Sequence, residues 1–326
     1  MKHKVLITGG AGYIGSVIAS YLLDCGFEVT VVDDLSTGNK GSVDKRASFH
    51  QGSILDETYL VEALHGIDTV IHCAAKSLVE ESFASSQVYS QVNTDGTNTL
   101  LKAMTQSGIN KIIFSSTAAV YGDANENPLP ENSQINPINP YGQSKYAAEQ
   151  LVAEFAKKDN AAVTFRYFNV AGSYKSYNGE LLVENHQNET HLIPKTFKNA
   201  LRNGSDSKVE IYGNNFPTKD GTCIRDYLHV KDLAHAHLLA LEKLEMGISK
   251  VFNLGSGIGY SVLEVLNEIE KVMGVELNRV ISPARKGDPA VLLAAIDKAK
   301  DQLGWKPEAA LNEIISSSWQ GLKQLG

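Results

Sequence analysis

Residues 4–15 read Lys-Val-Leu-Ile-Thr-Gly-Gly-Ala-Gly-Tyr-Ile-Gly and decide the fold. In this stretch an apolar run ends in glycines at positions 9, 12 and 15. Gly9 lets the chain turn sharply out of a strand, Gly12 lets backbone approach a pyrophosphate, and Gly15 lets a helix pack on the strand. The helix then faces the phosphates with unpaired N–H groups and the positive end of its dipole. The stretch therefore predicts a dinucleotide-binding βαβ unit.

A second apolar run, residues 29–32, ends in Asp33. This carboxylate follows Gly15 at close to the ~20 residues typical of the acid that hydrogen-bonds an adenine ribose. Because a carboxylate there would repel a 2′-phosphate, the sequence predicts NAD rather than NADP as the cofactor. Strand, glycines, helix and terminal acid together are a more specific signal than three glycines alone.

The composition is that of an ordinary globular protein. The chain has 326 residues, of which 43% are hydrophobic and 21% charged. Its net charge is −7 with no long block of one sign, so neither nucleic acid nor a membrane is expected as a partner. The first strand follows Met1 almost at once, so we expect no cleavable signal. Cys25, Cys73 and Cys223 lie far apart, which predicts reduced thiols in the cytoplasm and no metal site.

Strands and helices alternate through the first half of the chain. We expect strands at 4–8, 28–33, 68–72, 110–115 and 161–167, and helices at 12–25, 56–65, 87–107 and 142–158. This alternation predicts an α/β fold with a doubly wound parallel (Rossmann) sheet that binds ligands at the carboxyl ends of its strands. The pattern breaks after about Asn169, which predicts a second, smaller mixed α/β domain. We expect a cofactor domain over 1–170 with a returning segment at about 223–255, and a substrate domain over 171–222 and 256–326.

Tyr141 and Lys145 form the strongest candidate for a reactive pair. They lie four residues apart on a predicted helix and so share one face, and Thr117 ends the preceding strand. A free phenol titrates near 10, which is too high for a base at neutral pH. One cation at about 6 Å, with an effective dielectric of ~20, contributes roughly 3 kcal/mol, or about two pKa units. The positive nicotinamide of bound NAD would supply the remaining lowering of the Tyr141 pKa. Tyr141 is then expected to accept a proton from a sugar or alcohol hydroxyl that Thr117 positions.

Five runs of sequence carry a family resemblance. They are 8–15 (TGGAGYIG), 114–122 (FSSTAAVYG), 139–145 (NPYGQSK), 166–169 (RYFN) and 217–227 (PTKDGTCIRDY). With them the chain resembles the extended short-chain dehydrogenase/reductases and, within these, the UDP-glucose 4-epimerases over nearly its whole length. The last run is the most specific to the epimerases.

The resemblance, together with the residues above, implies a set of site residues. Tyr141, Lys145 and Thr117 are expected to be catalytic. Expected cofactor contacts are Gly9, Gly12, Tyr13, Ile14, Gly15, Asp33, Asn93, Ser115, Tyr141, Lys145 and Tyr167. Expected substrate contacts are Thr117, Tyr141, Asn169, His191, Leu192, Tyr212, Arg225, Arg285, Asp288 and Leu292. Among these, Asn169, Arg225 and Arg285 would hold the UDP diphosphate and adjoining groups, and Tyr212 would pack on uracil.

Several positions depart from the family pattern. Ser53 stands where an aspartate usually reaches adenine, and Lys76 lies one residue before Ser77, where a lysine usually lies near the nicotinamide ribose. His191 takes a position that is asparagine in some relatives. Leu292 aligns with the position that gates bulky 2-substituents of the sugar. Leucine is smaller than tyrosine but larger than cysteine, so acceptance of N-acetylated sugars stays open.

The function implied is reversible C4 epimerisation of UDP-hexoses through a 4-keto sugar, with NAD retained. A homodimer in the cytoplasm is the expected form. A 4,6-dehydratase is disfavoured, because Ala118 and Ala119 follow Thr117 where that chemistry needs an acid. Open alternatives are a UDP-N-acetylglucosamine or UDP-pentose 4-epimerase and a UDP-glucuronate decarboxylase. A non-catalytic NAD-binding sensor is a remoter one, since a pure binder needs no tuned phenol.

Overall fold

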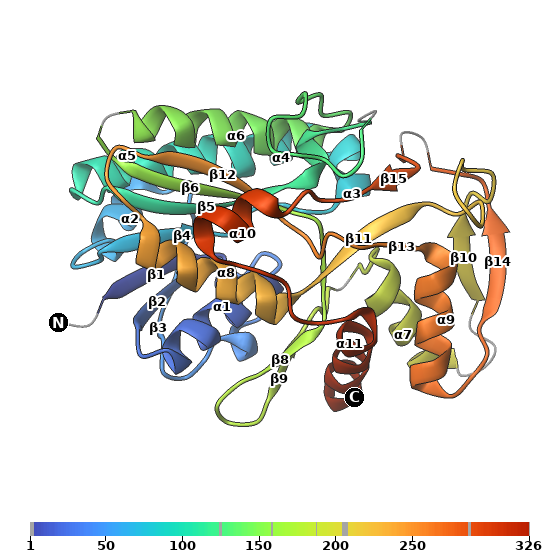
Figure 1. The fold of residues 1–326 in the computed structure, drawn as a ribbon. Helices are drawn as coiled ribbons and strands as arrows, with labels where there is room; N and C mark the ends of the chain where they lie inside the picture. Colours follow the sequence, from blue (N-terminus) through green and yellow to red (C-terminus); the bar gives the residue numbers. More distant parts are fainter. Residues whose placement is uncertain are drawn as a thin grey trace.

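A large parallel sheet forms the centre of the computed structural model, which describes residues 3–123, 126–157, 159–186, 188–203, 208–285 and 288–325 (Figure 1). All neighbouring strands of this sheet run parallel. Its seven strands lie in the order β12 (Ser249–Leu254), β6 (Ala161–Tyr167), β5 (Lys111–Thr117), β4 (Thr69–His72), β1 (Lys4–Thr8), β2 (Glu28–Asp33) and β3 (Ser48–Gln51). The predicted doubly wound sheet is therefore confirmed.

Helices cover both faces of this sheet (Figure 1). On one face lie α1 (Tyr13–Asp24), α8 (Val230–Lys243) and α10 (Asp297–Leu303), which share an apolar core with the sheet. On the other lie α2 (Glu57–Ala63), α5 (Gly96–Gln106) and α6 (Pro140–Ala156). Alternate residues of β1 enter opposite cores, Val5 and Ile7 the first and Leu6 the second. Burial on both sides explains the unbroken apolar runs of the central strands.

Two differences from the sequence expectation have local causes. The sheet gains β3 at its edge, a short strand with mostly exposed side chains and therefore no apolar alternation to predict it. The helix expected at 87–107 is α4 (Ser86–Tyr89) and α5 joined by a π-helical stretch, Ser90–Asp95. Lys158, the expected last residue of the helix that became α6, lies outside the described residues.

Smaller elements gather beyond the carboxyl ends of the large sheet (Figure 1). The strands are β7 (Asn169–Ala171), β11 (Ile224–His229), β13 (Gly259–Ser261) and β15 (Val291–Leu292) in one sheet, β10 (Lys208–Tyr212) with β14 (Asn278–Ser282), and β8 (Ser173–Lys175) with β9 (Leu181–Val183). The longer helices are α7 (Leu192–Asn203), α9 (Val262–Met273) and α11 (Leu311–Leu325). Short helices α3 (Val79–Ala84), Lys40–Ser42 and Ala118–Val120 complete the described elements.

The C-terminal third of the chain contributes to both regions. Trp305 and Leu303 are buried in the core that α1 and α8 share with the large sheet, whereas Ile314 and Leu322 of α11 pack with α7 and α9. We keep the two-domain division at the expected boundaries as a proposal. Its substrate part then includes α10, which packs against the cofactor part.

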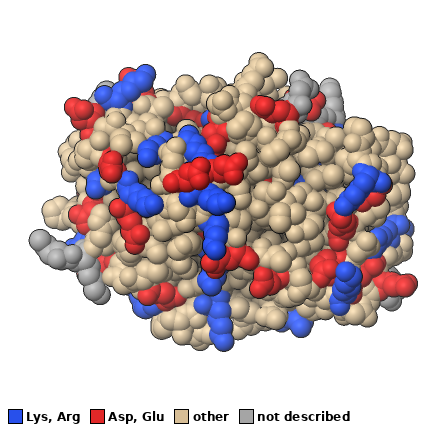
Figure 2. All heavy atoms as spheres, viewed as in Figure 1, with Lys and Arg blue, Asp and Glu red and all other residues tan. Residues whose placement is uncertain are grey.

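The surface carries charges of both signs. Figure 2 shows Lys and Arg interspersed with Asp and Glu on the face drawn, without a large patch of either sign. Among the described residues, no helix combines the length and the apolar character needed to cross a bilayer.

Candidate functional site

A cavity of about 1180 Å³ opens at the carboxyl ends of the strands of the large sheet. One end is lined by the glycine turn and Asp33, the middle by Tyr141 and Lys145, and the far end by residues of the smaller elements. Its lining includes most of the expected site residues, namely Gly9, Gly12, Tyr13, Ile14, Gly15, Asp33, Ser115, Thr117, Tyr141, Lys145, Tyr167, Asn169, His191, Arg225, Arg285, Asp288 and Leu292. Asn93, Leu192 and Tyr212 are not among the lining residues.

The glycine turn has the geometry that close approach to a phosphate requires. Gly9 has φ +72°, and a Cβ there would lie 2.6 Å from the amide nitrogen of Ala74, two residues after the end of β4. A Cβ at Gly15 would collide with the Gly9 carbonyl oxygen, so α1 packs against the turn only with glycine here. Gly12 begins α1 without a side-chain cap. The N–H groups at this helix end therefore remain available to a phosphate in the cavity.

Asp33 ends β2 at the same edge of the sheet. Its two carboxylate oxygens accept hydrogen bonds from the Ala11 amide at 3.0 Å and the Leu35 amide at 2.8 Å. Burial raises the pKa of Asp33, and the two backbone hydrogen bonds counteract that rise. The carboxylate is thus held beside the glycine turn, where an adenine ribose would lie if a dinucleotide pyrophosphate bound α1.

Tyr141 lies in the first turn of α6 and points its phenol at the end of β5. The Thr117 hydroxyl accepts a hydrogen bond from the Ala119 amide at 3.1 Å, and Thr117 and Tyr141 both line the cavity. Burial raises the pKa of Tyr141, and the Thr117 side chain lowers it by less. The net shift is therefore opposite to the lowering expected from Lys145, which is not one of its causes.

Lys145 is 3% exposed, with its ammonium 4.3 Å from the centre of the Phe114 ring. Burial lowers the pKa of Lys145 to about 8. The side chain is therefore still mainly protonated at neutral pH, although it is buried. A buried cation one helical turn from Tyr141 supplies positive charge to this part of the cavity.

Two polar networks fix the walls around this pair. The Tyr167 hydroxyl hydrogen-bonds Ser115 Oγ and His237 Nε2, each at 2.8 Å. Asn93, in the π-helical stretch, binds the backbone of Lys76 through its amide oxygen at 2.8 Å and nitrogen at 3.0 Å, and also donates to Ser144 Oγ at 2.9 Å. Asn93 thus ties the loop after β4, where Lys76 lines the cavity, to α6.

Two arginines converge on the far end of the cavity. Arg225 donates to the Pro289 carbonyl at 2.8 Å and lies 3.4 Å from an Asp288 carboxylate oxygen. The Arg285 guanidinium lies over the Tyr212 ring, 4.1 Å from its centre. In this arrangement the guanidinium covers one face of the ring, so uracil would have to use the other face or displace Arg285. Leu292 pairs with Arg225 across β15 and β11, which brings the gate position beside Arg225.

The loop from β9 to α7 forms another part of the wall. His191 Nδ1 lies 2.8 Å from a Glu184 carboxylate oxygen, and both residues line the cavity with His186. Leu192 begins α7 and packs into the core of the smaller elements, which makes it a support for this wall. Sequence reasoning did not single out Glu184 or His186. The signal available was the close repetition of Glu and His between residues 184 and 191.

A buried ion pair behind the reactive pair was also missed. Arg166 of β6 donates to both oxygens of Glu149 of α6, at 3.0 and 2.8 Å, and both side chains are buried. Glu149 also accepts a hydrogen bond from Ser116, next to Thr117. Sequence spacing does not reveal this pair, because it joins a helix to a strand.

One cavity joins a dinucleotide turn to Tyr141 and the buried Lys145, so the fold and the site define a dinucleotide-dependent enzyme of the Rossmann class. Comparison with known proteins narrows that class. The model of the NAD dependent epimerase/dehydratase family matches residues 5–255, and the chain belongs to this family.

Relatives within the family are similar to this chain over nearly its full length. The chain is 45% identical to a UDP-glucose 4-epimerase of Lacticaseibacillus casei, over 97% of this chain and 95% of the relative. It is 42% identical to one of Corynebacterium glutamicum, over 99% of this chain and 97% of the relative. A crystal structure of UDP-glucose 4-epimerase from Bifidobacterium longum, in complex with NAD+ and UDP, has a TM-score of 0.92 and 35% identity and covers 98% of both chains. The resemblance to the UDP-glucose 4-epimerases is thereby confirmed.

Proposed function

We propose that this protein interconverts UDP-glucose and UDP-galactose by inverting C4 through a transient 4-keto sugar, with NAD as its cofactor. The observation that carries the proposal is that Thr117, Tyr141 and Lys145 line one cavity, which also reaches the glycine turn and Arg225. Full-length similarity to UDP-glucose 4-epimerases supports the same reaction. Relatives solved with NAD bound support the cofactor.

Each residue takes one task in the reaction. Tyr141 accepts the proton of the sugar O4 hydroxyl and later returns it, while Thr117 orients that oxygen. Lys145 supplies the nearby positive charge that favours the phenolate. The chemistry that bound NAD contributes is the transient oxidation of C4 and its reduction again. Between the oxidation and the reduction of C4, the keto sugar must rotate so that its other face meets the cofactor, while Arg225 and Arg285 hold the diphosphate.

This geometry favours tight binding of the nucleotide and weak binding of the sugar. Paired guanidinium donors suit a pyrophosphate, because each presents its N–H groups in a fixed plane. The lining also includes residues without charge, among them Thr117, Ala118 and Phe168. A sugar that is held by such residues, and not by charged groups, meets few ionic contacts that would oppose its rotation.

The direct test is an NMR time course of the purified protein with UDP-galactose and UDP-N-acetylgalactosamine in one tube and no added NAD. Conversion of UDP-galactose at C4 supports the proposal and a retained cofactor. If neither sugar reacts even after NAD is supplied, the proposal is wrong. Decarboxylation of UDP-glucuronate or epimerisation of a UDP-pentose would then be tested next.

Asp33→Asn is expected to weaken NAD binding about 10- to 100-fold, because a hydrogen bond to a charged group is worth about 1.5–3 kcal/mol. The change also leaves only one acceptor oxygen for the Ala11 and Leu35 amides. Fluorescence titration of cofactor-depleted protein with NADH measures the loss. Asp301→Asn is the matched control, since Asp301 is exposed and does not line the cavity, so affinity should change little. Equal affinity of the Asp33 variant and the wild type would refute the assigned role.

Leu292→Tyr is expected to disfavour N-acetylated sugars at least about 10-fold relative to UDP-galactose, because pocket size alone discriminates to this extent. The ratio of kcat/KM for the two substrates measures it. Leu293→Tyr serves as the control on the neighbouring residue, which does not line the cavity. An unchanged ratio in the Leu292 variant would show that the gate lies elsewhere.

We also propose a homodimer in the cytoplasm. Family similarity supports the dimer, and three free cysteines are consistent with a reducing compartment. Sedimentation of the purified chain tests the oligomeric state, for which a single species of one chain would contradict the proposal.

A further inference from the structure

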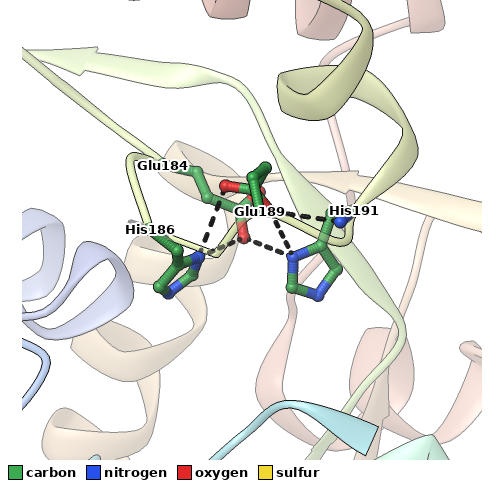
Figure 3. Close-up of side chains that lie close together, drawn as sticks. All are labelled: Glu184, His186, Glu189 and His191. Carbon is green, nitrogen blue, oxygen red and sulfur yellow. Dashed lines mark hydrogen bonds and ion pairs between the residues drawn. The ribbon is translucent and has the colours of Figure 1, made fainter. Parts of the chain in front are cut away.

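Two glutamates and two histidines meet in the loop between β9 and α7. They are Glu184, His186, Glu189 and His191, and their side chains turn toward a common point in Figure 3. One ligand-type atom from each lies within 4.8 Å of the others. Both histidines present Nδ1 to the carboxylates. The arrangement brings together two imidazoles and two carboxylates, which is a donor set for a transition-metal ion.

Buried atoms in this cluster lack hydrogen-bond partners. The side chains of Glu184 and Glu189 are only 7% and 4% exposed. Yet Glu189 Oε2 and His186 Nδ1, which face each other, are buried without a hydrogen bond, and so is Glu184 Oε2, although the Glu184 oxygen nearest the histidines is Oε1. Such atoms are costly to bury unless something satisfies them. The Lys198 ammonium, 3.8 Å from Glu189, is too far to serve as a hydrogen-bond donor.

The distances between the donor atoms suit a small tetrahedral ion. Metal–ligand bonds of about 2.0–2.2 Å place tetrahedral ligand atoms about 3.3–3.6 Å apart. His186 Nδ1 lies 3.4 Å from Glu184 Oε1 and 3.5 Å from Glu189 Oε2. His191 Nδ1 lies 2.8 Å from the same Glu184 oxygen but 3.1 Å from the other Glu189 oxygen, Oε1. Tetrahedral binding therefore requires the Glu189 carboxylate to rotate and the two His191 edges to open by a few tenths of an ångström.

We propose that Glu184, His186, Glu189 and His191 bind one divalent transition-metal ion, with Zn²⁺ the best match. Two nitrogen ligands favour zinc over calcium or magnesium, which prefer all-oxygen shells. The ion neutralises the two buried carboxylates. Four protein ligands fill a tetrahedral shell, so the site is structural.

The proposed ion has a definite consequence for the cavity. Glu184, His186 and His191 all line it, and the loop they belong to is held at one end by β9 and at the other by α7. An ion joining both halves of this loop fixes the wall that faces the substrate. The site goes beyond the proposed epimerase activity, and neither depends on the other.

Zinc binding to the full chain tests this proposal directly. The untagged protein is treated with a chelator and titrated with Zn²⁺ against a chromophoric competitor, and its metal content is measured by mass spectrometry. We expect one Zn²⁺ per chain and a rise in Tm on adding zinc. Co²⁺ in place of Zn²⁺ should give the intense visible absorption of a four-coordinate site. Absence of saturable binding by the wild type would leave only an ion-pair cluster and overturn the proposal.

Substitutions of the proposed ligands test where the ion binds. His186→Ala should weaken Zn²⁺ binding at least about 100-fold, since losing even an outer-shell partner costs 10- to 100-fold. Glu189→Gln should weaken it in the same direction. His65→Ala is the matched control, because His65 is an exposed histidine remote in sequence from the loop. Equal zinc affinity in the His186 and His65 variants would overturn the site, and the Co²⁺ spectrum of the wild type decides the question independently of how the variants fold.

Discussion

Tyr141→Phe should lower kcat for UDP-galactose by about 10²- to 10⁴-fold, the usual contribution of a positioned general acid–base group. The change removes one oxygen atom and keeps the ring, including its edge-to-face contact with Tyr89 at 6.3 Å. Binding of NAD should therefore be retained. Steady-state turnover by NMR, with cofactor content measured on the same sample, separates the two effects.

Tyr146→Phe is the matched control for this experiment. Tyr146 lies on the same helix, α6, but packs into the small core around Val120 and Phe168. The same chemical change there should leave turnover close to that of the wild type. If Tyr141→Phe turned over as fast as Tyr146→Phe, the proton-transfer role of Tyr141 would be wrong and the non-catalytic reading would gain support.

Glu149→Ala should lower the free energy of unfolding by about 3–5 kcal/mol, because it leaves the buried Arg166 guanidinium without its carboxylate. Arg166 also donates to the Tyr121 hydroxyl and the Glu131 carbonyl, each at 3.0 Å, and these neutral acceptors do not compensate a buried charge. Proteins of this kind are stable by only about 5–15 kcal/mol, so the effect is large. Urea unfolding followed by circular dichroism measures it.

Two further variants distinguish an unpaired charge from general damage to α6. The double variant Glu149→Met, Arg166→Met removes both charges and should regain most of the lost stability. Glu154→Ala removes the carboxylate of an exposed ion pair with Lys157 on the same helix and should change stability by about 0–1 kcal/mol. A double variant as unstable as Glu149→Ala would mean that packing, and not charge, is lost at this position.

Much of the fold could be predicted because its signals are local. Strands β1 and β2 and the helix between them follow from residues 4–33, where apolar runs, glycines and a terminal acid stand close together in the sequence. The edge strand β3 could not be predicted in this way, because its exposed side chains leave no periodic signal and only the pairing with β2 makes it a strand.

The same distinction between local signals and long-range contacts applies to the residues of the candidate site. Tyr141 and Lys145 could be paired from their spacing, since a helix fixes which residues share a face. The roles of Arg225 and Arg285 came only from the family resemblance, because nothing near them in sequence indicates a shared cavity. The loop cluster around Glu184 was missed, although its four residues lie within one short segment, because a loop has no fixed periodicity from which to infer convergence.

The sequence by itself thus determined the parallel sheet, the dinucleotide turn and the helix that carries the reactive pair, because backbone geometry repeats over a few residues. Only the tertiary structure decided how deeply each group is buried and which distant groups surround it. Burial raises the pKa of Tyr141 and lowers that of Lys145 to about 8, and it encloses Glu149 with Arg166. These properties depend on the water and charge that neighbouring segments exclude or supply, and that is set by packing between parts of the chain far apart in sequence.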